Sequence, residues 1–323
     1  MVRILVLSFI LSVIAGCTNR REQPQGKPSA ETQNPPKSIP VPNFDKTRAF
    51  NYLVKQTDFG PRNPNSRGHG ECREFLIAEF RKLADEVGVQ DFPHAGYDGE
   101  TLVLTNIIAS FNPQLKERIL LCAHWDTRPR AEQDENKARR NEPIIGANDG
   151  ASGVAVLLEL ATLLHTQKPL IGVDLILFDG EDYGKEGDHA SYLLGSRYFA
   201  LNLAPEKQYR FGILLDMVGD KFLDLPKEGN SVKFAPDIVS MVWSKAKELG
   251  YSEFLDETGQ PVYDDHLPLN EIGIKTIDII DFNYPDPTHR YWHSHQDIPE
   301  NCSPESLNAV GTVLTHVIYS QRP

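Results

Sequence analysis

The chain has 323 residues, of which 40% are hydrophobic and 24% are charged, so it can bury a full core and is too apolar to be mainly disordered. Its 33 basic and 45 acidic residues give a formal net charge of -12 at pH 7. Such an acidic surface does not neutralise phosphates, which argues against nucleic acid as a partner.

The N-terminus has the features of an export signal. Arg3 precedes an apolar run over residues 4–16, which is long enough for the core of a signal peptide and too short to span about 30 Å of hydrocarbon. The run ends in small residues before Cys17, and this pattern resembles the lipobox of bacterial lipoproteins. We therefore expect a signal peptide over residues 1–16, a lipid on Cys17, and a place in the cell envelope facing the periplasm. A plain secretory signal would instead release a soluble protein.

The next segment, residues 17–43, is rich in Pro, Gln, Ser and Asn and holds almost nothing to bury. It is predicted to be an extended, disordered tether that carries the lipidated cysteine, followed by one catalytic domain over residues 44–323. Membrane contact is expected only through the lipid, and a monomer is favoured. The three later cysteines cannot all pair within one chain, so a bridge between Cys72 and Cys122 and three free thiols, Cys302 included, both stay open.

From Phe44 onward, strand-like apolar runs alternate with segments of helical periodicity. This alternation predicts an α/β fold in three layers, with a mixed, mostly parallel central β-sheet flanked by helices on both faces. Helices are predicted over residues 45–57, 66–86, 150–166, 236–249 and 304–319. Strands are predicted over residues 101–111, 118–123, 173–178, 211–215 and 274–280.

Acidic residues and histidines recur at the carboxyl ends of these strands or in nearby loops, where open α/β sheets place their ligands. In chain order they are His124 and Asp126, Asp149, Glu181 and Asp182, Asp216, Asp264 and His266, and His293. Each is weak evidence alone, because a His-x-Asp pair is usually only hydrogen-bonded and an Asn-Asp-Gly before a helix is usually a turn and an N-cap. Carboxylates gathered in one place, however, raise one another's pKa unless a cation neutralises them.

A set of imidazoles and carboxylates without cysteine suits Zn²⁺ in a catalytic site, which has three protein ligands and an open position. The adjacent Glu181 and Asp182 divide naturally between the two tasks such a site needs. One carboxylate can bind the metal while its neighbour moves protons.

The order His-x-Asp, Asn-Asp-Gly-x-Ser-Gly, Gly-Glu-Asp, strand-end Asp and late Trp-His resembles the zinc aminopeptidase family, which also contains the glutaminyl cyclases. The resemblance covers roughly Phe44 to the C-terminus. Several details look more like the cyclase branch and its bacterial members, chiefly the run Asp264, Asp265, His266 and the position of Trp292.

The resemblance implies one zinc ion held by Asp149, Asp182 and His293, with Glu181 as the proton-transfer residue. The activity it implies is that of a glutaminyl-peptide cyclotransferase, an acyltransferase acting on peptides or proteins with an N-terminal glutamine. In that reaction Glu181 accepts a proton from the attacking α-amine and returns it to the departing ammonia, leaving pyroglutamate.

The resemblance also assigns the residues around the zinc. Asp216 and Asp264 are expected to support Glu181 in a hydrogen-bonded acid network. Trp292 is expected to line the pocket for the glutamine side chain.

Two further substrate contacts follow from the resemblance. His266 is expected to hydrogen-bond in the substrate pocket, or else to brace the Asp264 loop. Either Tyr183 or Tyr192 would take the place of a pocket tryptophan that animal cyclases carry soon after the acidic pair, or the pocket would be more open.

Two other functions stay open. His124 and Asp216 could complete a second metal site with Asp149 as the bridge, giving a two-zinc aminopeptidase that hydrolyses N-terminal residues. An inactive, surface-anchored binding protein would keep the fold and a vestigial metal site, although the presence of Glu181 argues against this.

The remaining polar residues of interest are expected to have structural roles. Asp126 is expected to orient His124 rather than to bind metal. Other histidines, such as His69, have no acidic partner at ligand spacing and are expected at the surface or at helix caps, and His295 is expected in a solvated loop.

Overall fold

The computed structural model describes residues 39–323, which form one unit. The predicted signal peptide, the lipidation site Cys17 and most of the predicted tether lie outside the described residues. Within residues 39–323 no helix has both the length and the apolar character needed to cross a membrane.

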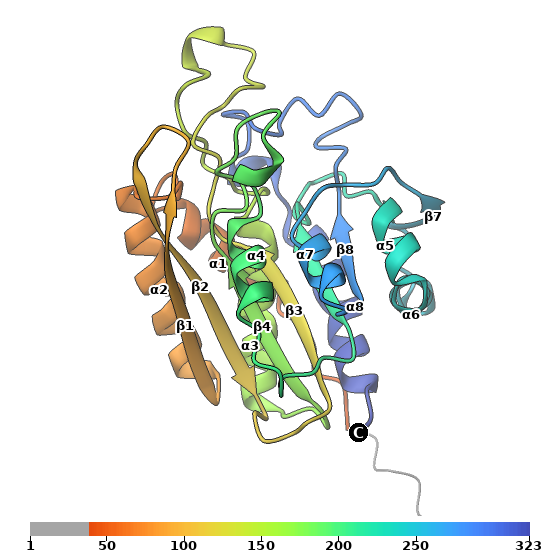
Figure 1. Ribbon diagram of the computed structural model, residues 1–323. Helices are drawn as coiled ribbons and strands as arrows, with labels where there is room; N and C mark the ends of the chain where they lie inside the picture. Colours follow the sequence, from red (N-terminus) through yellow and green to blue (C-terminus); the bar gives the residue numbers. More distant parts are fainter. Residues whose placement is uncertain (1–38) are drawn as a thin grey trace, which may run out of the picture. The chain divides into compact units, whose positions relative to one another are not determined.

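A six-stranded sheet in the order β1-β2-β4-β3-β5-β8 forms the middle layer (Figure 1). Its strands are β1 (Glu86–Ala95), β2 (Thr101–Phe111), β3 (Arg118–His124), β4 (Gly172–Phe178), β5 (Gly212–Asp216) and β8 (Thr276–Ile280). β3 pairs in parallel with β4 and β5, β5 pairs in parallel with β8, and β1 and β2 form an antiparallel extension at one edge. The predicted mixed, mostly parallel sheet is confirmed.

Helices cover both faces of this sheet, because alternate side chains of each strand point to opposite sides. Ile119 and Leu121 of β3 pack in the larger core, whereas Leu120 and Cys122 pack in a second core on the other side. The larger core is covered by α1 (Lys46–Thr57), α2 (Arg67–Leu83), α3 (Ala151–Thr166), α6 (Pro236–Leu249) and α8 (Pro304–Ser320). The second core is covered by α4 (Leu194–Leu201) and α7 (His266–Glu271). Because β3 and β4 are buried on both faces, they appear in the sequence as continuous apolar runs.

Shorter elements complete the described chain. β6 (Leu225–Lys227) and β7 (Phe254–Thr258) pair in parallel as a separate two-stranded sheet, and α5 (Gly229–Phe234) lies between them in sequence. Three 3-10 turns lie at Lys137–Arg139, His189–Ser191 and Pro299–Asn301.

The structure differs from the predicted elements mainly at the sheet edge. The helix expected to reach residue 86 ends at Leu83, and β1, which was not predicted, begins at Glu86. As an edge strand, β1 is largely exposed and includes Gly88 and Pro93, so it lacks the apolar density that marked the inner strands. The cysteines Cys72, Cys122 and Cys302 are all buried and free, so the bridge left open above is not formed.

Candidate active site

The carboxyl ends of the parallel strands meet at one edge of the sheet and line a cavity of about 380 Å³. His124 ends β3, Asp216 ends β5, and the segment after β4 carries Glu181 and Asp182. The walls of the cavity are both acidic and aromatic. They include Asp149, Glu181, Asp182, Asp216, Asp264 and His293 together with Tyr192, Tyr263, Phe282 and Trp292.

Three side chains at this cavity form a ligand set of the kind zinc prefers. Asp149, Asp182 and His293 each offer one donor atom, and these atoms lie within 4.8 Å of one another. His293 Nε2 lies 3.2 Å from Asp182 Oδ1 and 3.6 Å from Asp149 Oδ2. Asp182 Oδ2 is buried without a hydrogen-bond partner among the described residues. One imidazole and two carboxylates, one of which has an unpaired buried oxygen, fit a divalent cation.

The backbone around Asp149 is held by a buried carboxylate that sequence reasoning missed. Asp297 accepts hydrogen bonds from the backbone N–H of Asn148 at 2.7 Å and of Asp149 at 3.1 Å. Gly150 then takes φ +99°, and a Cβ there would lie 2.7 Å from the carbonyl oxygen of Asp126. The N-cap of α3 is Gly150 and no side chain caps the helix there, whereas Asp149 lines the cavity as expected of a metal ligand.

A second group of ligand atoms shares Asp149. His124 Nε2 lies 3.1 Å from Asp149 Oδ1 and 3.2 Å from Asp216 Oδ1, and the three donor atoms lie within 4.8 Å of one another. Burial lowers the pKa of His124, but the nearby carboxylates, Asp126 first, outweigh burial and raise this pKa well above its ordinary value. A protonated imidazole can therefore supply the positive charge that a second metal would bring.

Asp126 has a second role besides the expected one beside His124. Its carboxylate lies 3.6 Å from Nδ1 of His124, but its hydrogen bonds come from the backbone N–H of Glu181 at 3.1 Å and of Asp182 at 3.2 Å. It therefore anchors the acidic pair after β4 more directly than it orients His124.

Glu181 contributes a carboxyl group to the cavity wall beside the ligand set. Burial, and then the negative charge of Asp182, raise the pKa of Glu181 well above its usual value. Burial and the charge of Asp216 raise the pKa of Asp264 to about 8. Glu181, Asp216 and Asp264 thus face one cavity, and a carboxyl there can hold a proton at neutral pH.

The expected substrate contacts are only partly on the cavity wall. Trp292 lines the cavity and stacks on His293, with the ring centroids 3.7 Å apart, and Tyr192 lines it as well. Tyr183 turns away, because its hydroxyl bonds to Glu100 and accepts from the backbone N–H of Tyr97 at 3.1 Å. The prediction that Tyr183 lines the substrate pocket is therefore corrected in favour of Tyr192.

His266 is also displaced from its expected position. It is fully buried, it is not among the residues that line the cavity, and its Nε2 lies 3.4 Å from Glu228 Oε2. Since it follows Asp264 and Asp265 at the start of α7, it lies behind the loop that carries Asp264. The expectation of a substrate hydrogen bond is corrected, and the bracing role remains.

Two other histidines have acidic partners that sequence spacing did not reveal. His69 is buried, its Nε2 lies 3.0 and 2.9 Å from the two oxygens of Asp179, and its ring stacks on Trp125. His295 Nδ1 lies 2.7 Å from Asp134 Oδ2. The surface placement expected for His69 and the solvated loop expected for His295 are both wrong.

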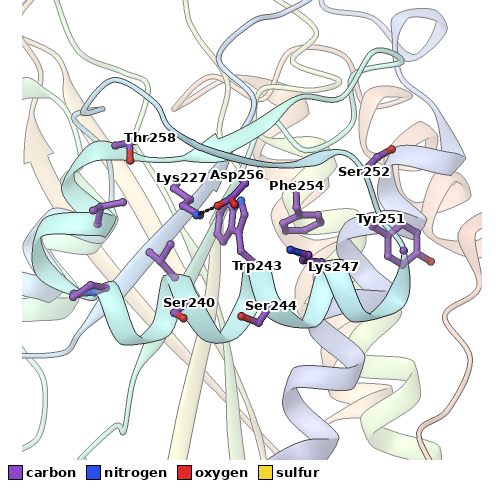
Figure 2. A pocket seen from close by; sticks show the side chains of 14 residues that line it. Lys227, Ser240, Trp243, Ser244, Lys247, Tyr251, Ser252, Phe254, Asp256 and Thr258 are labelled. Atoms are coloured by element: carbon purple, nitrogen blue, oxygen red, sulfur yellow. Dashed lines mark hydrogen bonds and ion pairs between the residues drawn. The ribbon is translucent and has the colours of Figure 1, made fainter.

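A larger cavity of about 710 Å³ lies between α6 and β7 (Figure 2). Figure 2 shows Lys227 paired with Asp256 close to the ring of Trp243, with Phe254 to the right of them in this view. Asp256 is the one carboxylate among its lining residues, and no histidine lines it. The smaller cavity, with its clustered carboxylates and imidazoles, is therefore the candidate active site.

Comparisons with known proteins point to the same chemistry. The sequence profile described as peptidase family M28 matches residues 106–318. The structure is similar to that of a Bacteroides thetaiotaomicron glutaminyl cyclase bound to N-acetylhistamine, with a TM-score of 0.84 and 42% identity over 88% of this chain and 100% of that chain. A Zn-dependent exopeptidase from Parabacteroides distasonis gives a TM-score of 0.84 and 39% identity over 87% of this chain and 100% of that chain. A glutaminyl-peptide cyclotransferase of Bos taurus is 24% identical over 300 residues, which is 80% of this chain and 79% of the relative.

Proposed function

This chain belongs to peptidase family M28, in its glutaminyl cyclase branch, and we propose that it converts the N-terminal glutamine of peptides or proteins to pyroglutamate with release of ammonia. The observation that carries this proposal is the position of Glu181. Its carboxyl group faces the same cavity as Asp149, Asp182 and His293, and Trp292 lines that cavity as well.

Asp149, Asp182 and His293 would hold one zinc ion. When bound, the ion would polarise the side-chain amide of the substrate glutamine and stabilise the negative charge that develops on its oxygen. The name of the Parabacteroides distasonis relative supports zinc as the metal. A proton on His124, whose Nε2 lies 3.1 Å from Asp149 Oδ1 and 3.2 Å from Asp216 Oδ1, would balance these carboxylates without a second ion, so we propose one ion per chain.

Glu181 would carry the proton through the reaction. As the substrate's α-amine nitrogen bonds to the amide carbon, Glu181 accepts a proton from that nitrogen. When the bond between this carbon and the amide nitrogen breaks, Glu181 donates the proton to the leaving group, which departs as ammonia. Both reacting groups belong to one residue, so the pocket has to orient them and does not need to activate a water molecule.

Ammonia release from a peptide that begins with glutamine tests the proposal. The zinc-loaded protein is expected to release ammonia, and Glu181→Gln is expected to slow turnover by about 10²- to 10⁴-fold because the proton carrier is lost. Glu186→Gln is the matched control, since Glu186 also lines the cavity but lies outside the ligand set, and it is expected to retain activity. Absence of ammonia release by the wild type, or full activity of Glu181→Gln, would contradict the proposal; peptide binding without turnover would indicate a binding protein.

A two-zinc aminopeptidase is the second candidate, because His124, Asp149 and Asp216 also lie at ligand distance from one another. Metal content separates the two functions. About one zinc per chain, with ammonia released from glutamine peptides, is expected for the cyclase. About two zinc ions, with cleavage of peptides that begin with leucine or alanine, would support the aminopeptidase.

We also propose that the enzyme is exported and anchored by a lipid on Cys17. The proposal rests on the apolar run over residues 4–16 and the small residues before Cys17. Expression of the full chain in a bacterial host, followed by membrane fractionation, tests it. The wild type is expected in the membrane fraction and Cys17→Ser in the soluble fraction; equal fractionation of the two would refute lipid anchoring.

A further inference from the structure

Arg128 lies in the segment after β3, and its side chain, 1% exposed, forms part of the wall of the active-site cavity. Burying a guanidinium is costly unless carboxylates and other acceptors replace the water it loses. The partners of Arg128 therefore indicate what this charge does in the site.

All five N–H groups of the Arg128 guanidinium have acceptors. Nε donates to Glu132 Oε1 at 2.9 Å, and Nη2 donates to the same carboxylate and, at 3.0 Å, to the hydroxyl of Tyr192. Nη1 donates to the backbone carbonyl of Asp182 at 2.8 Å and lies 3.4 Å from its Oδ1. No donor is left for a substrate, so any effect of Arg128 on the reaction passes through these partners.

The backbone of Asp182 is held on both sides from this one segment. Asp126 accepts from its backbone N–H and from that of Glu181, and Arg128 donates to its carbonyl oxygen. Two side chains that stand two residues apart after β3 therefore fix the peptide groups before and after the Asp182 Cα. These contacts fix the direction of the Asp182 side chain. Because an aspartate side chain is short, its carboxylate cannot reach the metal if the backbone is displaced.

The remaining contacts of Asp182 fit such a placement. Oδ1 lies between Nη1 of Arg128 and Nε2 of His293, at 3.4 and 3.2 Å. Oδ2 has no hydrogen-bond partner among the described residues, although it is buried. Arg128 thus holds one edge of the carboxylate and leaves the other oxygen unpaired.

We propose that Arg128, together with Asp126, is a positioning residue that sets the carboxylate of Asp182 for metal binding and Glu181 for proton transfer. The inference deepens the zinc-dependent cyclase proposed above and rests on it for the role of Glu181. The part that concerns metal binding can be measured without any turnover.

Two variants of Arg128 and one control test the inference. Arg128→Met is expected to weaken zinc affinity by about 10- to 100-fold, as measured by competition with a chelator, because residues that orient a metal ligand typically contribute this much. Arg128→Lys is expected to fall between the wild type and Arg128→Met, since lysine keeps the charge but cannot form the same fork of hydrogen bonds. The control is Arg118→Met at the opposite end of β3, where Arg118 is buried in an ion pair with Asp174.

The control separates positioning from simple stability. Arg118→Met is expected to lower the melting temperature while zinc affinity stays within about twofold of the wild type, because Arg118 lies at the other end of the strand. Arg128→Met is expected to alter the visible absorption of the Co²⁺-loaded protein and to lower kcat more than it raises KM, since no Arg128 donor is free for substrate.

Wild-type zinc affinity and an unchanged Co²⁺ spectrum in Arg128→Met would overturn the inference. If Arg128→Met does not fold, the same result in Arg128→Lys would overturn it. A wild-type protein that binds zinc and releases no ammonia would refute the proposed function but would leave the part concerning Asp182 and the metal standing.

Discussion

Glu228, at the N-terminus of α5, provides a quantitative test of how a buried carboxylate holds the loop that carries Asp264. Its side chain accepts four hydrogen bonds, from the backbone N–H of Asn230 at 2.7 Å, of Ser231 at 2.6 Å and of Val262 at 2.8 Å, and from the Ser231 hydroxyl at 2.6 Å. Val262 lies two residues before Asp264, at the wall of the active-site cavity. Glu228 thus ties the start of α5 to that wall.

The magnitude follows from the pKa of Glu228. Burial alone would raise it, but the imidazole of His266 and the hydrogen-bond donors outweigh burial and lower the pKa from 4.5 to about 2. A pKa lowered by folding stabilises the native state at pH values above the unfolded pKa, here by about 3 kcal/mol. This stabilisation is lost as the pH falls from about 4.5 towards 2.

Urea unfolding of the wild type and of Glu228→Gln between pH 7 and pH 3 checks this. The variant is expected to be less stable by about 3 kcal/mol at pH 7, and the difference is expected to shrink by about 2 kcal/mol at pH 3. Glu248→Gln, at an exposed site on α6, is the control and is expected to show no comparable change. A difference between wild type and Glu228→Gln that stays constant with pH would refute the reasoning, because hydrogen bonding alone would then explain it.

Three other outcomes are expected. Removal of zinc with a chelator should abolish ammonia release and lower the melting temperature, and added zinc should restore both. Activity that survives complete metal removal would contradict the assigned ligand set. Gly150→Ala should reduce zinc affinity, because Gly150 has φ +99° and an added Cβ would meet the carbonyl oxygen of Asp126, which would displace the backbone beside Asp149. Equilibrium zinc binding measures this effect. Unchanged affinity would show that Asp149 still binds the metal after such a displacement. His69→Ala should destabilise the fold by about 3–5 kcal/mol in urea unfolding, because the buried carboxylate of Asp179 loses its partner; a loss below about 1 kcal/mol would argue against a buried charge there.

The main layers of the fold were predictable because their signals are local in the sequence. β3 and β4 are buried on both faces and appear as continuous apolar runs, and α6 ends at Leu249, directly before Gly250, which has φ +84°. β1 was not predictable in this way, because an exposed edge strand needs no apolar run. The short helices α4, α5 and α7 span too few turns to establish a helical period.

The metal-binding part of the site was also largely predictable. Parallel strands end at one edge of a sheet, which predicted where the acidic residues gather. The resemblance to the zinc aminopeptidase family selected Asp149, Asp182 and His293 among them, and these three do lie at ligand distance. The substrate wall was less predictable. Tyr183 and Tyr192 lie in one loop, and only the hydrogen bonds of Tyr183 to the β1–β2 region show which of the two faces the cavity.

The amino-acid sequence by itself determined the kinds of chemistry available to this protein and the edge of the sheet where they gather, since residue type and strand position are properties of single segments. Only the tertiary structure decided which groups hold the site in place. Asp297 binds the backbone at Asp149 across 148 residues of sequence, and Arg128 reaches Asp182 across 54. Such contacts depend on which loops lie next to each other in the folded chain and on the direction of each side chain there. No single segment of the sequence determines either of these.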